Sequence, residues 1–301
     1  MISSLDPAAQ SFLAGLGQIQ QKMDTAQAQL TTGLAINNDS DAPDQIADLW
    51  QTRSNLDQAD QITSNLNQVQ TEVNTGESVL QSAVTLVEQA ETLGAQGASD
   101  TVDANTRQDL AESLGSVLQQ LVAVANTQVA GRYIFSGDDD QQAPYSIDLT
   151  QANPISSYQG TASTRQIQGA DGSTFSVGLT AQQIFDSSDA TQSVFTSITS
   201  LMQGLQNNDD TSINSALADV QSSDTYLNQQ LAFYGTTQDR VQSGVTFAQN
   251  YTTQLQTQLS GIQDANAAEA ATNLTEAQTQ YQAALQSRAQ IPNTSLFNYL
   301  G

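Results

Sequence analysis

The sequence of 301 residues contains no cysteine and no histidine. Without thiols the chain cannot form disulfides or use a cysteine nucleophile, and without imidazoles it cannot build the usual catalytic triads. Both absences also exclude zinc sites made of the common ligands. We therefore expect a protein that is held together by packing alone and that carries no metal or cofactor.

Positive charge is also scarce. Seven lysine and arginine residues stand against 31 aspartate and glutamate residues, which gives a net charge of −24. Nucleic acids and anionic membrane surfaces bind clustered cations, so neither is an expected partner. The acidic residues are scattered along the chain, which is typical of a solvated surface.

Long apolar runs are missing as well. No run approaches the roughly 18 residues that a transmembrane helix requires, so we expect no insertion into a membrane. Residues 1–13 lack the basic region and the continuous apolar region of a signal peptide. Taken alone, these features predict a cytoplasmic protein or one that is exported without a cleaved signal.

The apolar residues that are present follow a helical period at both ends of the chain. With 38% hydrophobic and 6% aromatic residues, the composition suits long helices with thin cores. Steps of three and four residues alternate along 2–30 and again along 267–291, as at the a and d positions of a coiled coil. The predicted assembly interface comprises an N-terminal seam of Ile2, Leu5, Ala9, Phe12, Leu16, Ile19, Met23, Ala26 and Leu30, a C-terminal seam of Ala267, Ala270, Leu274, Ala277, Tyr281, Ala284 and Ile291, and the two leucines Leu296 and Leu300 beyond it.

Neither seam can bury itself on a lone helix, because each is a narrow stripe. We predict that the two ends of the chain meet as a coiled coil. Several seam positions hold alanine, and one further position in the C-terminal repeat holds Arg288, so the pair is weak by itself. We therefore expect neighbouring subunits to complete it. The alternative is that each terminal helix packs on an ordinary globular core.

Loop-forming residues follow the first helical segment. Residues 31–44 contain Gly33, Pro43 and three aspartates at positions 39, 41 and 44. The aspartates resemble a calcium loop only superficially, because the glycine and glutamate of an EF-hand are missing from their places. We interpret the segment as a turn whose last residues cap the next helix.

Further helical patterns are predicted over 44–93, 103–130, 193–205 and 212–262. Gly131 stands where a glycine is expected after the helix 103–130, and Gly235 is a possible interruption of the helix 212–262. Strands are predicted at 132–137, 145–149 and 155–158, where aromatic and β-branched residues replace the helical period. Segments 164–169 and 173–179 flank Asp171 and Gly172, which is a strong signal for a β-hairpin.

The predicted fold is therefore mainly α with a small β-rich insertion. We expect an elongated rod of long antiparallel helices, in which the terminal helices form the coiled coil. Three domains are predicted. In the first, an N-terminal coiled-coil helix and loop, 1–43, pair with the C-terminal helix 263–301. The second is a helical rod domain of 44–131 and 191–262, and the third is a β-rich insertion domain of 132–190.

No catalytic constellation is visible. No glycine-rich phosphate loop precedes a helix, and no carboxylate lies in a pattern that would raise its pKa. We do not expect an enzyme, and screening for metal or nucleotide binding would test that class.

Several motifs resemble one known family. LTTGLAIN at 30–37, followed by the loop to Pro43, looks like the segment after the first helix of bacterial flagellins. ANT at 125–127 and GRYIFSG at 131–137 look like the hook–filament junction proteins of that family, the hook-associated proteins of the FlgL type. The ending SLFNYL at 295–300 also resembles the junction type more than the filament type.

The resemblance implies a structural subunit of the flagellum that joins hook to filament. Such proteins leave the cell through the flagellar type III export channel, and their terminal helices form an inner coiled-coil tube. The implied partners are further copies of the chain in a ring or layer, a neighbouring hook-associated protein, flagellin, and a cytoplasmic export chaperone on the C-terminal helix. A compact filament flagellin and a secreted coiled-coil adhesin or binding module remain the alternatives.

Overall fold

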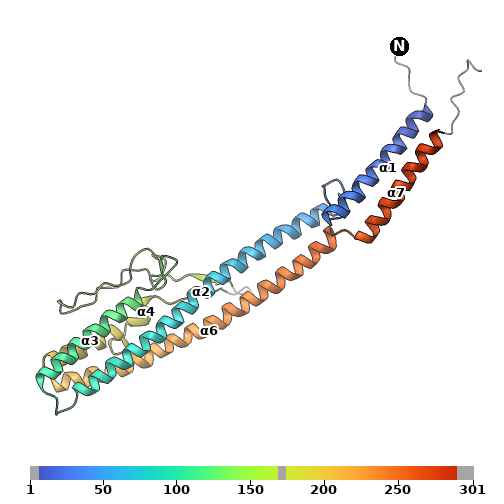
Figure 1. Cartoon of the computed structure of the whole chain (residues 1–301). Coiled ribbons are helices and arrows are strands. Elements are labelled where there is room, and N and C mark those ends of the chain that lie inside the picture. Colours follow the sequence, from blue (N-terminus) through green and yellow to red (C-terminus); the bar gives the residue numbers. More distant parts are fainter. Residues whose placement is uncertain (1–6, 169–173, 290–301) are drawn as a thin grey trace, which may run out of the picture. The chain divides into compact units, whose positions relative to one another are not determined.

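The computed structural model describes residues 7–168 and 174–289, and most of them are helical (Figure 1). The α-helices are α1 (Pro7–Thr32), α2 (Ile46–Gly97), α3 (Ala104–Ala125), α4 (Ala181–Phe185), α5 (Val194–Gln206), α6 (Asp210–Gln263) and α7 (Ala267–Ala289). A short 3-10 helix covers Ala190–Gln192. The strands β1 (Gln128–Val129), β2 (Arg132–Tyr133), β3 (Gln166–Gln168) and β4 (Thr174–Ser176) form two antiparallel hairpins. The predicted class, mainly α with a small β-rich insertion, is confirmed.

The chain forms two compact units. One unit contains residues 1–60 and 250–301, and the other contains residues 61–249. Helices α2 and α6 contribute residues to both units. Among the described residues, no helix combines the length and the apolar character needed to cross a membrane.

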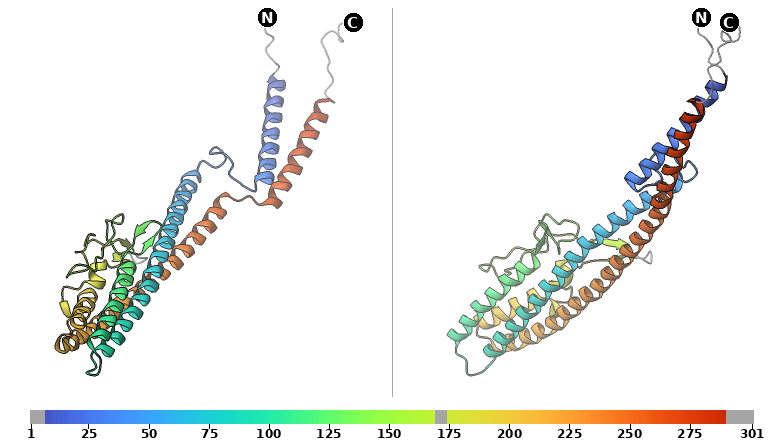
Figure 2. Two further views of the ribbon diagram at one scale, coloured as in Figure 1. Left: turned by 60° about the vertical axis from the view of Figure 1, so that its left-hand side comes forward. Right: turned by 45° about the vertical axis from the view of Figure 1, so that its right-hand side comes forward.

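Within residues 61–249, α2 and α6 run antiparallel (Figure 2). Gln238 donates a side-chain hydrogen bond to Asn74 at 3.0 Å, and Gln221 donates one to Glu91 at 2.8 Å. The residue numbers of the α6 partners therefore decrease as those of the α2 partners increase, as antiparallel helices require. The inward residues of α2 keep the predicted period: Leu66, Val69, Val73, Leu80, Ala83, Val87 and Ala90 are buried. The interruption predicted at Gly235 is wrong, since α6 continues to Gln263.

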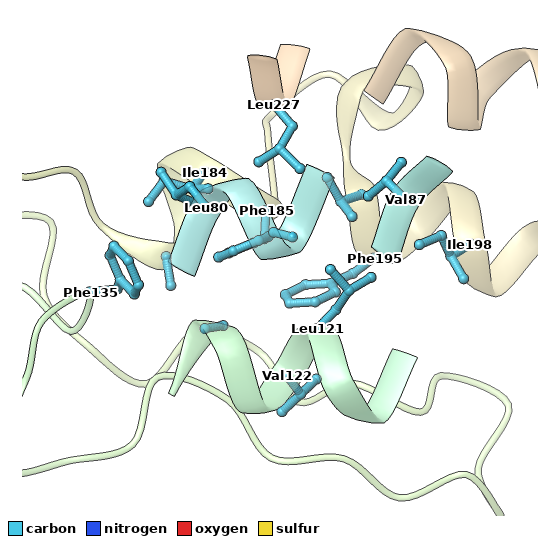
Figure 3. Packing of buried hydrophobic residues seen from close by; sticks show 14 of the residues in the cluster. Leu80, Val87, Leu121, Val122, Phe135, Ile184, Phe185, Phe195, Ile198 and Leu227 are labelled. Atoms are coloured by element: carbon cyan, nitrogen blue, oxygen red, sulfur yellow. The ribbon is translucent and has the colours of Figure 1, made fainter. Parts of the chain in front are cut away.

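The core of this unit lies where α3, α4 and α5 pack against α2 and α6 (Figure 3). The Phe185 and Phe195 rings stack with centroids 5.5 Å apart, and Tyr145 meets Phe195 edge-on at 5.0 Å. α2 does not end at residue 93 as predicted but continues to Gly97, because Gly94 is a packing position inside the helix. A Cβ atom at Gly94 would lie 2.7 Å from Leu201 Cδ2, so glycine permits the close approach of α5.

The third helix ends earlier than predicted, at Ala125. Asn126 stops it by pairing with the backbone of Tyr145: its Nδ2 donates to the Tyr145 carbonyl at 2.7 Å, and its Oδ1 accepts from the Tyr145 N–H at 3.1 Å. Gly131 is therefore not a helix-terminal glycine. It forms the β1–β2 turn with Ala130, and both have positive φ, 77° and 51°.

The insertion contains less sheet than predicted. The strand expected at 132–137 ends at Tyr133, and segments 145–149 and 155–158 pair only through a bridge between Ile147 and Ile155. The hairpin of β3 and β4 is confirmed, while its predicted turn at 171–172 lies outside the described residues. Helix α4 was not predicted. Its signal is a capping box, in which Thr180 and Gln183 satisfy each other's backbone N–H.

Candidate assembly interface

The two terminal helices lie side by side and antiparallel in the unit of residues 1–60 and 250–301 (Figure 1). Their closest packing uses small side chains: Ala26 of α1 and Ala270 and Ala277 of α7 are 2–3% exposed. The pairing of the two ends, predicted from their matching periods, is thus present within one chain.

The seam residues are unevenly covered. In the N-terminal seam Ala9, Phe12, Leu16, Ile19 and Met23 are half-buried, and in the C-terminal seam Leu274, Tyr281 and Ala284 are half-buried. Leu30 and Ala267 are exposed in this chain. Ile2, Leu5, Ile291, Leu296 and Leu300 lie outside the described residues. The two helices alone therefore leave much of the seam open, and its closure by neighbouring subunits stays a prediction.

Two polar contacts fix how α1 and α7 align. The Arg288 guanidinium lies over the Phe12 ring, 5.8 Å from its centroid. About two turns back along α7, the Tyr281 hydroxyl accepts a hydrogen bond from the Gln20 amide at 3.4 Å. The arginine that looked misplaced in the C-terminal repeat thus uses a cation–π contact to cover a half-buried aromatic ring.

A backbone clasp, formed by residues 33–35 and 263–265, joins the end of α1 to the connection between α6 and α7. Gly33 adopts a φ of 74° and ends α1, with its N–H donating to the Gln29 carbonyl at 2.9 Å. The Ala35 N–H donates to the Gln263 carbonyl at 2.6 Å, and the Ala265 N–H donates to the Gly33 carbonyl at 2.8 Å. Sequence reasoning found both helix breaks but not their pairing, which only the antiparallel register brings about.

The aspartates of the following loop have local roles. The Asp41 carboxylate accepts the backbone N–H groups of Asn37 and Asn38 at 2.9 and 2.8 Å, which closes the turn. Within residues 7–168 and 174–289, no group of three or more potential ligand side chains is placed to hold a metal ion. The geometry agrees with the interpretation of this segment as a turn.

A polar groove of about 600 Å³ runs between α1, the loop and α7. Its lining comprises Gln18, Gln21, Lys22, Thr25, Ala26, Gln29, Ala35, Asp41, Asn273, Glu276, Ala277 and Gln280. Sequence reasoning missed this groove, because only Ala26 and Ala277 of its lining belong to the seams and most of the other residues lie on the polar sides of the two helices. Apolar side chains are exposed elsewhere in the unit, with Leu13, Trp50 and Leu285 at 54%, 55% and 45%.

Within the unit of residues 61–249, an ion-pair cluster holds the β-rich insertion to α2. Glu72 of α2 binds Arg132 of β2 at 2.8 Å and Arg165, next to β3, at 3.0 Å. Arg132 also reaches Asp140 at 3.5 Å. The charges of this cluster largely satisfy one another, so we assign it a structural role.

Two sequence models of one family match the chain. The model of the bacterial flagellin N-terminal helical region matches residues 4–140, and that of the bacterial flagellin C-terminal helical region matches residues 211–300. No curated protein sequence matches the chain significantly.

Solved structures share the fold at low sequence identity. A proposed flagellar hook-associated protein from Vibrio parahaemolyticus is similar with a TM-score of 0.65 and 17% identity, over 74% of this chain and 100% of that one. FlgL from Xanthomonas campestris gives a TM-score of 0.61 at 15% identity, over 69% and 99% of the two chains. The flagellar junction protein FlgL from Legionella pneumophila gives 0.55 at 13%, over 72% and 98%.

Proposed function

The chain belongs to the bacterial flagellin family, and on that premise we propose that it is the structural subunit that joins hook to filament in a bacterial flagellum. The observation that carries the proposal is the antiparallel pair of α1 and α7, which brings both ends of the chain into one open interface. The fold that it shares with hook-associated proteins supports the junction role.

The role we propose is mechanical and not catalytic. Half-buried seam residues such as Phe12, Leu16 and Leu274 keep apolar surface that a neighbour can cover. Burial of apolar area contributes about 25 cal/mol per Å², so many partly open residues add up across a layer of subunits. The weak seam of one chain then becomes stable only in the assembled structure.

The proposed partners are further copies of the chain in a ring or layer, with a neighbouring hook-associated protein on one side and flagellin on the other. We also propose that the chain is exported by the flagellar type III route and works outside the cell. A cytoplasmic chaperone that covers the C-terminal helix would keep the open seam from premature contacts.

The main alternative is a compact filament flagellin, which would use the same terminal helices. The GRYIFSG and SLFNYL motifs at 131–137 and 295–300 favour the junction role. A secreted coiled-coil adhesin is a more distant alternative, because its ligand would have to bind an insertion whose two arginines are already paired with Glu72.

Deletion of the gene tests the proposal. Cells that lack the chain should build hooks, lose motility and release unpolymerised flagellin into the medium, and a plasmid copy should restore filaments. Purified protein that is seeded with fragments of its own polymer, or concentrated with precipitating salt, should stay monomeric. Long filaments in the electron microscope would show that the filament alternative is correct.

A further inference from the structure

The few cations of this acidic chain are almost all used inside the subunit. Each of the six arginines contacts a side chain of its own chain. These partners are Asp210 for Arg107, Glu72 for Arg132 and Arg165, Trp50 for Arg53, Phe175 for Arg240 and Phe12 for Arg288. Lys22, the only lysine, forms no ion pair with any described residue.

Lys22 lies on α1 in the wall of the groove between α1 and α7. Five of the twelve lining residues carry a neutral amide, namely four glutamines from the two helices and Asn273. Of the two carboxylates in the groove, Asp41 already accepts two backbone N–H groups, and neither Asp41 nor Glu276 pairs with Lys22. The groove therefore offers one free ammonium group surrounded by amide hydrogen-bond donors.

We propose that this groove receives a carboxylate of a second copy of the chain, which pairs with Lys22 when copies assemble into a layer. The proposal rests on the proposed function, because it needs an assembled layer. Two copies with a net charge of −24 repel each other, because each carries 31 acidic residues against seven basic ones. Lys22 is the one uncommitted cation that the described residues offer against this repulsion.

A second copy of the chain is the expected occupant because of where the groove lies and because of the carboxylates that each copy carries. The groove is built by the two helices whose seams are left open in one chain, so the same neighbours that cover the seams also reach the groove. Identical neighbours always supply carboxylates at fixed positions. A lysine suits this contact because its flexible stem can follow a single carboxylate without the planar alignment that arginine requires.

A single lysine makes the contact directly measurable. A carbodiimide condenses an amine with an adjacent carboxylate into an amide, and Lys22 is the only side-chain amine in the chain. Flagella isolated from cells should give a species of twice the subunit mass after this treatment. Peptide mass spectrometry should find Lys22 joined to an aspartate or glutamate of this chain, and the link should be absent from treated monomer.

Three variants distinguish the effect of the reactive amine of Lys22 from the effect of its positive charge. Lys22→Arg keeps the charge but removes the amine, so flagella should contain normal amounts of the chain and lose the cross-linked species. Lys22→Glu should lower the amount per flagellum several-fold, since repulsion replaces attraction. Gln27→Glu adds one negative charge on the same exposed helix, about 140° away around its axis, and should leave that amount unchanged.

The outcomes distinguish the two proposals. A link from Lys22 only within its own chain, a link to a different flagellar protein, or normal incorporation of Lys22→Glu would overturn the groove proposal alone. Normal flagella in cells without the chain would overturn the proposed function. The groove proposal would then fall with it, because there would be no assembled layer of this chain in the flagellum in which Lys22 could be cross-linked.

Discussion

At the scale of single residues, Asp224 is a partly buried carboxylate whose ionised form lowers the stability of the fold. It lies on α6, where burial raises its pKa, and the nearby carboxylates Glu88 and Glu91 of α2 raise it further. Its Oδ1 is buried and has no hydrogen-bond partner, while Oδ2 accepts from Asn228 at 3.1 Å. Ionised Asp224 therefore destabilises the fold.

We expect Asp224→Asn to raise the melting temperature at neutral pH. Because the pKa is higher in the folded state than in the unfolded state, the folded state binds the proton more tightly. The wild type is then relatively stable below the unfolded pKa and loses stability as pH rises through the folded pKa. Melting followed by circular dichroism should show a gain at about pH 7 that shrinks toward about pH 4. Asp239→Asn, an exposed change of equal charge on the same helix, should show little of this trend.

Phe12 tests whether the seam works between subunits. We expect Phe12→Asp to abolish motility while barely changing the melting temperature of the purified monomer. In the monomer the new carboxylate lies beside Arg288 and stays partly hydrated, whereas in the assembly it would be desolvated at a cost of several kcal/mol if unpaired. Phe12→Leu should keep motility. A large loss of monomer stability would instead place Phe12 in an ordinary core.

At the scale of elements, one buried arginine ties two helix connections together. Arg107, at the start of α3, is 3% exposed and bonds to Asp210 at 2.6 Å, to Asn208 at 2.8 Å and to the Ser99 carbonyl at 3.4 Å. These partners lie between α2 and α3 and at the start of α6. The contact fixes how the two helix pairs meet.

Arg107→Ala should lower the free energy of unfolding by about 2 kcal/mol, because it removes charge-assisted hydrogen bonds from a buried site. Arg240→Ala, which removes an exposed arginine over the Phe175 ring, should cost about 0.5 kcal/mol. Urea unfolding measured by circular dichroism compares the two. Equal losses would mean that Arg107 contributes no more than a surface contact.

The helices and strands differ in how well the sequence predicts them. Periodic apolar residues such as Val69, Val73 and Val87 predicted α2, since burial of one face requires that spacing. The insertion was predicted less well, because single side chains decide it. Asn126 stops α3 by bonding to Tyr145, a residue 19 positions away, and no local pattern announces such a contact.

At the scale of the whole molecule, the stabilising core and the open seam belong to different units. Every member of the main hydrophobic cluster, from Leu66 to Ala248, lies within residues 61–249. The seam residues were found from their period, and an incomplete cover was expected, but which of them a single partner helix covers could not be predicted. A heptad pattern gives the direction of a stripe and not the number of helices that cover it.

This separation predicts that the ends are needed for assembly and not for folding of the middle. A chain that lacks residues 1–30 and 267–301 retains the whole cluster from Leu66 to Ala248. We expect it to be a soluble helical monomer with one cooperative melting transition, within a few degrees of the full chain.

The same truncated chain should fail to join flagella, because it has lost both seams and the groove that holds Lys22. Expression in cells lacking the full chain, followed by sedimentation of flagella and detection of the bound protein, measures this directly. Export has to be checked by looking for the truncated chain in the medium, since a chain that is not exported cannot assemble. A truncated chain that still enters flagella would place the assembly contacts in residues 31–266 and contradict an interface made by the terminal helices.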